Sequence, residues 1–163
     1  MVSLDNTWHI LAHVVQGLAH IHARNLVHLD MKPQNILVTS ICAKIADFGL
    51  CQESPVLCSA DREGDRRYMA PEVLTPAPLL ASSDVFSLGL IALEMALCIQ
   101  VPENGPMWQQ LRQGDLELVE KVAPPLSDLI KSMLHPQARM RPTCRDLLKH
   151  PILDSYARRV LSL

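Results

Sequence analysis

The sequence predicts a mainly α-helical fold with one small β element. Apolar residues recur at helical spacing over residues 7–24, and the stretch SSDVFSLGLIALEMAL (82–97) is apolar on nearly every side, which is typical of a buried helix. Two short apolar runs, ILV at 36–38 and the start of AKIADFG at 43–49, indicate a pair of strands. A chain of 163 residues can bury one hydrophobic core, so we expect a single domain.

The elements of the N-terminal half follow from periodicity and from proline. The first helix is expected from about Thr7 to Arg24, with a cap from the polar residues at 5–7. Pro33 prevents a helix from continuing through the next segment, which leaves room for the two strands. Residues 51–68 have no periodicity and carry dense charge, so they are predicted to form a long loop.

Beyond Pro71 the pattern is helical. The buried helix of residues 82–97 is expected to begin with serine caps. Shorter helices are predicted at 107–112, 126–134 and 142–149, the last with proline in its first turn.

Composition argues against several classes of function. A net charge of −2 without a Lys/Arg run gives no electrostatic case for nucleic-acid binding. The five cysteines include no C-x-x-C pair, which argues against a disulfide framework or zinc site and favours a reducing, intracellular compartment. His9 and His13 have metal-ligand spacing, but no third ligand lies nearby, so zinc is the less favoured interpretation. The longest apolar run stops at Glu94, so no membrane segment is expected.

The segment HLDMKPQN (28–35) sets an acid, a lysine and an amide at short spacing in a non-periodic stretch. Either Asp30, Lys32 and Asn35 belong to an ordinary solvated loop, or their side chains converge on a charged ligand. Three further motifs follow in the chain: DFG at 47–49, APE at 70–72 and DVFSLG at 84–89.

In this order, the four motifs resemble the C-terminal lobe of a eukaryotic protein kinase. The resemblance runs from residue 1 to about residue 153 and leaves 154–163 as a C-terminal tail. It implies that ATP and Mg²⁺ are the cofactors. Asp30 would accept the proton of the substrate hydroxyl, Lys32 would face the γ-phosphate, and Asn35 and Asp47 would hold the metal.

The same resemblance assigns supporting roles to five other residues. His28 would anchor the loop, and Phe48 would pack so as to orient Asp47. Glu72 would pair with Arg141 of the RMRP segment. Asp84, on the buried helix, would accept backbone N–H bonds from the loop that contains Asp30.

Within the kinases, the segments VHLDMKPQN, EGDRRYMAPEVL and WQQLRQG are similar to the Wee/Myt family. That similarity implies Ser/Thr or dual Thr/Tyr specificity, inhibitory phosphorylation of a cyclin-dependent kinase, and delayed mitotic entry. It also implies a location in the cytoplasm or nucleus, or at the periphery of endoplasmic reticulum or Golgi membranes in a longer parent protein.

Two positions depart from the general kinase pattern. Leu29 replaces the arginine that usually binds a phosphorylated activation loop, so we expect little switching by loop phosphorylation. Asp65 replaces a threonine, and its carboxylate is predicted to pair with Lys32.

The sequence contains no Gly-rich loop, because no two of its six glycines are closer than nine residues, and no lysine precedes Lys32. We therefore expect a kinase fragment whose N-terminal lobe is missing, with negligible activity alone and with exposed apolar side chains where that lobe would sit. The alternative is a non-catalytic, truncated product that acts as an interaction module.

Overall fold

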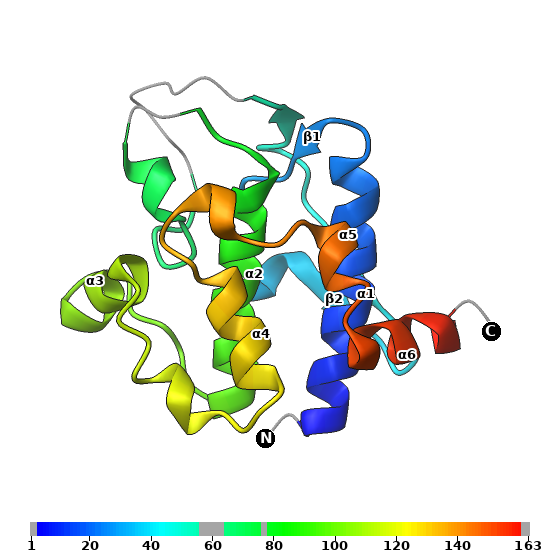
Figure 1. Cartoon of the computed structure of the whole chain (residues 1–163). Helices are drawn as coiled ribbons and strands as arrows, with labels where there is room; N and C mark the ends of the chain where they lie inside the picture. The colour runs from blue at the N-terminus through cyan, green and yellow to red at the C-terminus, as the bar shows by residue number, and fades with distance from the viewer. Residues whose placement is uncertain (1–2, 56–63, 76–77, 161–163) are drawn as a thin grey trace.

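The computed structural model describes residues 3–55, 64–75 and 78–160. Its helices and strands follow one another along the chain as drawn in Figure 1: α1 (Leu4–His22), β1 (Leu26–Val27), η1 (Pro33–Asn35), β2 (Ile36–Val38), β3 (Ala43–Ile45), β4 (Gln52–Glu53), η2 (Pro71–Leu74), α2 (Ala81–Leu97), α3 (Pro106–Gln113), η3 (Val119–Lys121), α4 (Leu126–Met133), η4 (Ala138–Met140), α5 (Cys144–Leu147) and α6 (Pro151–Val160), where η denotes a 3₁₀ helix.

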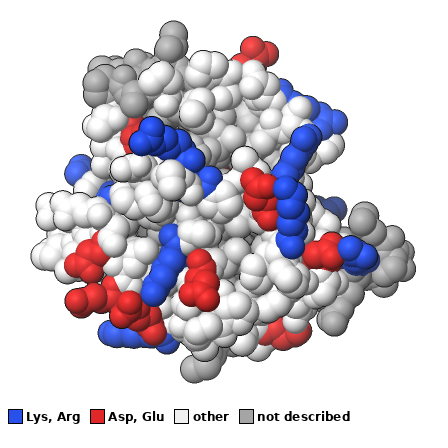
Figure 2. Space-filling model, in the orientation of Figure 1, with Lys and Arg blue, Asp and Glu red and all other residues white. Residues whose placement is uncertain are grey.

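The predicted fold class, mainly α with a small β element, is confirmed. The strands form two antiparallel pairs, β2 with β3 and β1 with β4. Helix α2 lies in the middle of the molecule, with α1 and α6 on one side and α3 on the other (Figure 1). On the face shown in Figure 2, acidic and basic side chains are interspersed and form no large field of one sign.

Helix α1 begins earlier than the periodicity predicts. Ser3 is its N-cap, and the Ser3 hydroxyl accepts a hydrogen bond from the backbone N–H of Asn6 at 3.1 Å. The expected cap at residues 5–7 was therefore wrong, because Ser3 lies outside the apolar pattern that defined the helix. The helix buries the predicted face, including Leu11, Val15 and Leu18.

Helix α2 is buried along most of its length, with every residue from Ser83 to Glu94 enclosed. Leu80, rather than a serine, occupies its N-cap, so the expected serine cap was also wrong. Gly89 allows the helix to approach α4 closely. A Cβ there would lie 2.8 Å from Cδ2 of Leu134 and 3.0 Å from Cβ of Met133.

The last part of the chain differs from the prediction at α5. Thr143 is the N-cap of that helix and forms a capping box with Asp146, so Pro142 precedes the helix instead of occupying its first turn. Helix α6 runs through residue 153, where the kinase-like region was expected to end. Its Ala157 is buried and accepts a hydrogen bond from Nε2 of Gln16 on α1 at 3.3 Å.

The predicted loop at 51–68 contains the two-residue strand β4, and its residues 56–63 lie outside the described part of the chain. None of the helices in the described ranges has the length and apolar composition needed to cross a bilayer.

Candidate active site

The segment from 28 to 35 brings its three polar side chains together. Asp30 and Asn35 are buried, so an ordinary solvated loop does not describe them. The Lys32 ammonium donates to Oδ2 of Asp30 at 2.7 Å. Nδ2 of Asn35 donates to the same oxygen at 2.9 Å and to the Asp30 backbone carbonyl at 2.8 Å. Pro33 begins the 3₁₀ turn η1, which folds Asn35 back toward Asp30.

These contacts leave the two oxygens of the Asp30 carboxylate in different environments. In the described part of the chain, the hydrogen bonds to this carboxylate reach Oδ2 alone. Oδ1 lies toward the backbone of Gly64, where a Cβ added to that glycine would be 3.9 Å away. Oδ2 is therefore fixed by a cation and an amide, while Oδ1 remains the acceptor on the side of the 64–70 segment.

The next motif is brought to the loop by strand pairing. Ile36 pairs with Ile45, and the backbone N–H of Ala46 donates to the carbonyl of Asn35 at 2.9 Å, so Asp47 lies one residue after the position opposite Asn35. Asp47 is exposed, has a φ of 60°, and its Oδ1 accepts the N–H of Gly49 at 3.2 Å. Aspartate tolerates this left-handed conformation better than most residues.

Asn35 and Asp47 have suitable chemistry for magnesium. Because the nitrogen of the Asn35 amide is used by Asp30, its oxygen is the end that can meet a cation. An amide oxygen and an exposed carboxylate are hard donors, and Mg²⁺ is commonly held by one or two carboxylates together with substrate phosphates. Among the described residues, no group of three or more His, Cys, Asp or Glu side chains is placed so that it could hold a metal ion.

His28 connects the two motifs. Its buried ring accepts the Asp30 N–H at Nδ1 (3.3 Å) and, with the proton on Nε2, donates to the Ala46 carbonyl at 3.2 Å. The ring centroid of Phe48 is 5.3 Å from that of His28, although the Phe48 side chain is 53% exposed. The imidazole therefore sets the distance between the backbone at Asp30 and the backbone that leads into Asp47.

Asp84 holds the start of the same loop. This carboxylate, on α2, is almost fully buried and accepts the N–H groups of His28 and Leu29, both at 2.9 Å. His22 adds a third contact, with Nε2 at 2.8 Å from Oδ2 of Asp84. Sequence reasoning missed His22, because a histidine in the last turn of a helix carries no motif of its own.

Glu72 and Arg141 form a bidentate ion pair, with Nη1–Oε1 at 2.7 Å and Nη2–Oε2 at 2.9 Å. The Ser83 hydroxyl donates to Oε1 of Glu72 at 2.8 Å. The remaining N–H groups of Arg141 donate to the backbone carbonyls of Ser82, His135 and Pro136. The pair fixes the end of the APE motif against α2.

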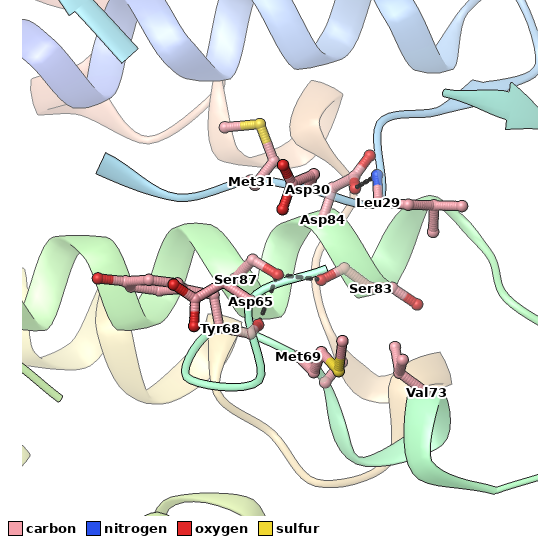
Figure 3. A pocket seen from close by; sticks show the side chains of 11 residues that line it. Leu29, Asp30, Met31, Asp65, Tyr68, Met69, Val73, Ser83, Asp84 and Ser87 are labelled. Carbon is pink, nitrogen blue, oxygen red and sulfur yellow. Dashed lines mark hydrogen bonds between the residues drawn. The ribbon is translucent and has the colours of Figure 1, made fainter. Parts of the chain in front are cut away.

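Residues 64–70 face the loop across a gap of about 10 Å³, room for about one water molecule. Figure 3 shows Asp30 and Leu29 on one side of this gap and Asp65, Tyr68 and Met69 on the other. The predicted pairing of Asp65 with Lys32 was wrong. Instead, Oδ2 of Asp65 lies 3.6 Å from Nη1 of Arg67, and Oδ1 of Asp65 accepts the backbone N–H of Arg67 at 2.9 Å. Lys32 pairs with Asp30.

Comparison with known proteins decides the family. The family described as "Protein kinase domain" matches residues 1–153. The chain belongs to the protein kinase family. The matched range includes both the loop around Asp30 and residues 47–49.

The similar kinases are of the Wee/Myt type, which confirms the resemblance seen in the motifs. The "Membrane-associated tyrosine- and threonine-specific cdc2-inhibitory kinase" of Drosophila melanogaster is 42% identical over 98% of this chain and 31% of its own length. The wee-1.3 kinase of the same description from Caenorhabditis elegans is 41% identical over 91% of this chain and 23% of its own length. The "Mitosis inhibitor protein kinase mik1" of Schizosaccharomyces pombe is 41% identical over 88% of this chain and 28% of its own length. The chain thus spans less than a third of the length of these relatives.

Proposed function

We propose that this chain supplies the catalytic loop and the metal-holding residues of a Wee-type protein kinase that phosphorylates a cyclin-dependent kinase. The observation that carries the proposal is the buried Asp30 carboxylate, with one oxygen held by Lys32 and Asn35 and the other facing the 64–70 segment. The substrate class is taken from the names of the relatives, which describe cdc2-inhibitory and mitosis-inhibitor kinases. An intracellular location follows from that substrate.

In the proposed reaction, the oxygen of a substrate hydroxyl attacks the γ-phosphorus of ATP. The bond from that phosphorus to the β–γ bridging oxygen breaks, ADP leaves, and the hydroxyl proton passes to Oδ1 of Asp30. Lys32 neutralises charge beside the carboxylate and the transferred phosphoryl group. Mg²⁺, when held by Asn35 and Asp47, supplies further neutralisation of phosphate charge.

We further propose that the 163-residue chain alone transfers phosphate negligibly. Its sequence contains neither a Gly-rich loop nor a lysine upstream of Lys32, so half of the usual nucleotide contacts are absent from it. Leu37, Val38 and Ile41 on the β2–β3 hairpin are 57%, 56% and 66% exposed. These apolar side chains also favour the second candidate function, a non-catalytic module that binds a partner through this hairpin.

The test compares two preparations with a kinase-dead cyclin-dependent kinase as substrate: the 163-residue chain, and the same chain preceded by a kinase N-terminal lobe. We expect phosphate transfer from the second preparation alone. In it, Asp30→Asn should lower the rate about a hundred- to ten-thousand-fold, since a positioned general base contributes that much. Asp115→Asn makes the same chemical change at an exposed position and should leave the rate unchanged.

Each outcome has a defined meaning. Transfer by the 163-residue chain alone would contradict the proposed inactivity. A lobe-containing preparation that transfers nothing, yet binds the cyclin-dependent kinase, would favour the interaction module. Full activity of the Asp30→Asn variant would refute the role given to that carboxylate.

A further inference from the structure

Arg112, on α3, is a buried guanidinium whose partners are carbonyl groups. Its side chain is buried, and among the described residues no carboxylate forms an ion pair with it. Nε and Nη2 form a fork on the Met69 carbonyl at 3.0 and 2.7 Å, and Nη2 also donates to the carbonyls of Arg67 (2.9 Å) and Arg66 (3.2 Å). Burial, and then the charge of Arg66, lower the pKa of Arg112 to about 10, so the group remains a cation at neutral pH.

Trp108, one turn earlier on α3, supports this cation. The guanidinium carbon of Arg112 lies 3.9 Å from the centroid of the Trp108 ring, and Nη1 of Arg112 donates to the Trp108 carbonyl at 3.0 Å. The indole N–H of Trp108 donates to the Arg66 carbonyl at 3.1 Å. Cation–π contact and carbonyl dipoles together replace the counter-ion that a buried arginine usually has.

The carbonyls bound in this way belong to the segment that faces Asp30. Ser87 of α2 donates to the remaining carbonyl of the series, that of Tyr68, at 2.7 Å (Figure 3). Four successive carbonyls, from residue 66 to residue 69, are therefore held by side chains of α2 and α3. Residues 64–70 contain no described helix or strand, so these side chains fix their conformation.

Phosphorylation is the usual means of ordering the segment of a kinase that corresponds to residues 64–70. The residues near this segment point to a means of ordering it that uses no phosphate. Leu29 stands at the position from which an arginine would reach a loop phosphate. The Leu29 side chain packs with Val73 against Val27 and Leu79. Arg112 contacts the segment from α3, and its Nε, Nη1 and Nη2 groups already donate to carbonyls.

We propose that Arg112 and Trp108 are positioning residues that keep segment 64–70 ordered opposite Asp30, so that the protein substrate is received without a loop phosphate. This inference rests on the proposed kinase function. A Gly64 backbone close to the Leu29 carbonyl and to Oδ1 of Asp30 places the held segment beside the proton acceptor. The clamp should therefore act on recognition of the protein substrate and leave ATP binding unaffected.

The first arm of the test measures amide hydrogen exchange in the 163-residue chain. Arg112→Lys keeps the charge but removes the forked donors, and it should speed exchange in residues 64–70 by about tenfold or more, because hydrogen bonds to a charged group are lost. Trp108→Phe keeps an aromatic ring but loses the indole N–H and part of the ring face that contacts Arg112, and it should have a smaller effect at the same residues. Arg139→Lys makes the same substitution at an exposed arginine and should change nothing. Unchanged exchange in helix α1 shows that each variant is folded.

The second arm uses the preparation with an N-terminal lobe. Arg112→Lys should raise KM for the protein substrate about tenfold and leave KM for ATP within about twofold. Equal changes in both KM values, or exchange at 64–70 no faster than in the parent, would overturn the inference. If the parent transfers no phosphate, the proposed function fails, and hydrogen exchange still decides whether the clamp exists.

Discussion

Replacement of Glu72 by glutamine perturbs a well-enclosed ion pair, the one that Glu72 forms with Arg141. The Arg141 side chain is 0% exposed and Glu72 is 12% exposed, with the bidentate contacts at 2.7 and 2.9 Å. Glutamine keeps one oxygen for Nη1 of Arg141 but presents an NH₂ group to Nη2. The substitution therefore leaves a buried cation without its counter-charge and turns one hydrogen bond into a contact between two donors.

The expected cost follows from these contacts. Removing one partner of a buried ion pair destabilises a protein by about 3–5 kcal/mol. We expect about 3 kcal/mol, the lower end of that range, because Arg141 keeps the carbonyls of Ser82, His135 and Pro136 as partners. For a chain of this length, that loss lowers Tm by about 6–12 °C.

Urea unfolding followed by circular dichroism measures the change. Glu120→Gln is the matched control, since Glu120 and Lys131 form an exposed pair at 3.4 Å whose loss should cost less than about 1 kcal/mol. The double variant Glu72→Gln/Arg141→Met should be more stable than Glu72→Gln alone, because it no longer buries an unpaired charge. If Glu72→Gln unfolds at the same urea concentration as the Glu120→Gln control, the reasoning about this pair is wrong.

Three further predictions concern pH and phosphate. Burial, and then His9, lower the pKa of His13 from its ordinary value of 6.5. The stability that comes from the neutral ring is therefore present above pH 6.5 and is lost as pH falls through the lower pKa of the folded state. When pH is lowered from 8 to 5 in urea unfolding, the stability of His13→Leu relative to the parent should increase, and no increase would contradict this. Burial raises the pKa of Glu94 above 4.5 despite its hydrogen bond from Tyr68, so the stability present below pH 4.5 declines as pH rises through the pKa of the folded state. Glu94→Gln should flatten this decline of the unfolding free energy with pH, and an unchanged dependence on pH would argue against the shift. Because Leu29 offers no cation to a loop phosphate, phosphatase treatment of the lobe-containing preparation should leave its rate within about twofold, and a large loss would show that a phosphate matters.

The parts of the site that could be predicted are those in which spacing along the chain determines geometry. Asp30, Lys32 and Asn35 lie within six residues around a proline, so one 3₁₀ turn is enough to bring them together. The pairing of β2 with β3 likewise follows from two short apolar runs separated by a turn. Local backbone chemistry decides both features, and the sequence displays it directly.

The parts that could not be predicted depend on side chains that meet across the fold. Asp65 was expected to pair with Lys32, but its carboxylate pairs with Arg67, two residues along the chain, while Lys32 pairs with Asp30. Nothing in the sequence shows that His22 reaches Asp84, 62 residues further along the chain. Arg112 looks like a surface residue of an amphipathic helix, and only the packing of α3 on residues 66–69 encloses it.

The buried helix α2 unites the two sides of the proposed site. Asp84 binds the backbone of the loop that contains Asp30, and Ser87, one turn later on the same helix, binds the carbonyl of Tyr68 in the facing segment. Their positions differ by three residues, which is about 4.5 Å along a helix axis. One short stretch of α2 therefore binds both the loop and the segment that line the gap of about 10 Å³. Because Gly89 lets α4 pack closely on α2, the helix that carries both anchors is also fixed from its far side. The separation between Asp30 and the segment opposite it is therefore set by one rigid element of the core, and Arg112 of α3 adds hydrogen bonds that hold the segment from the other side of the chain.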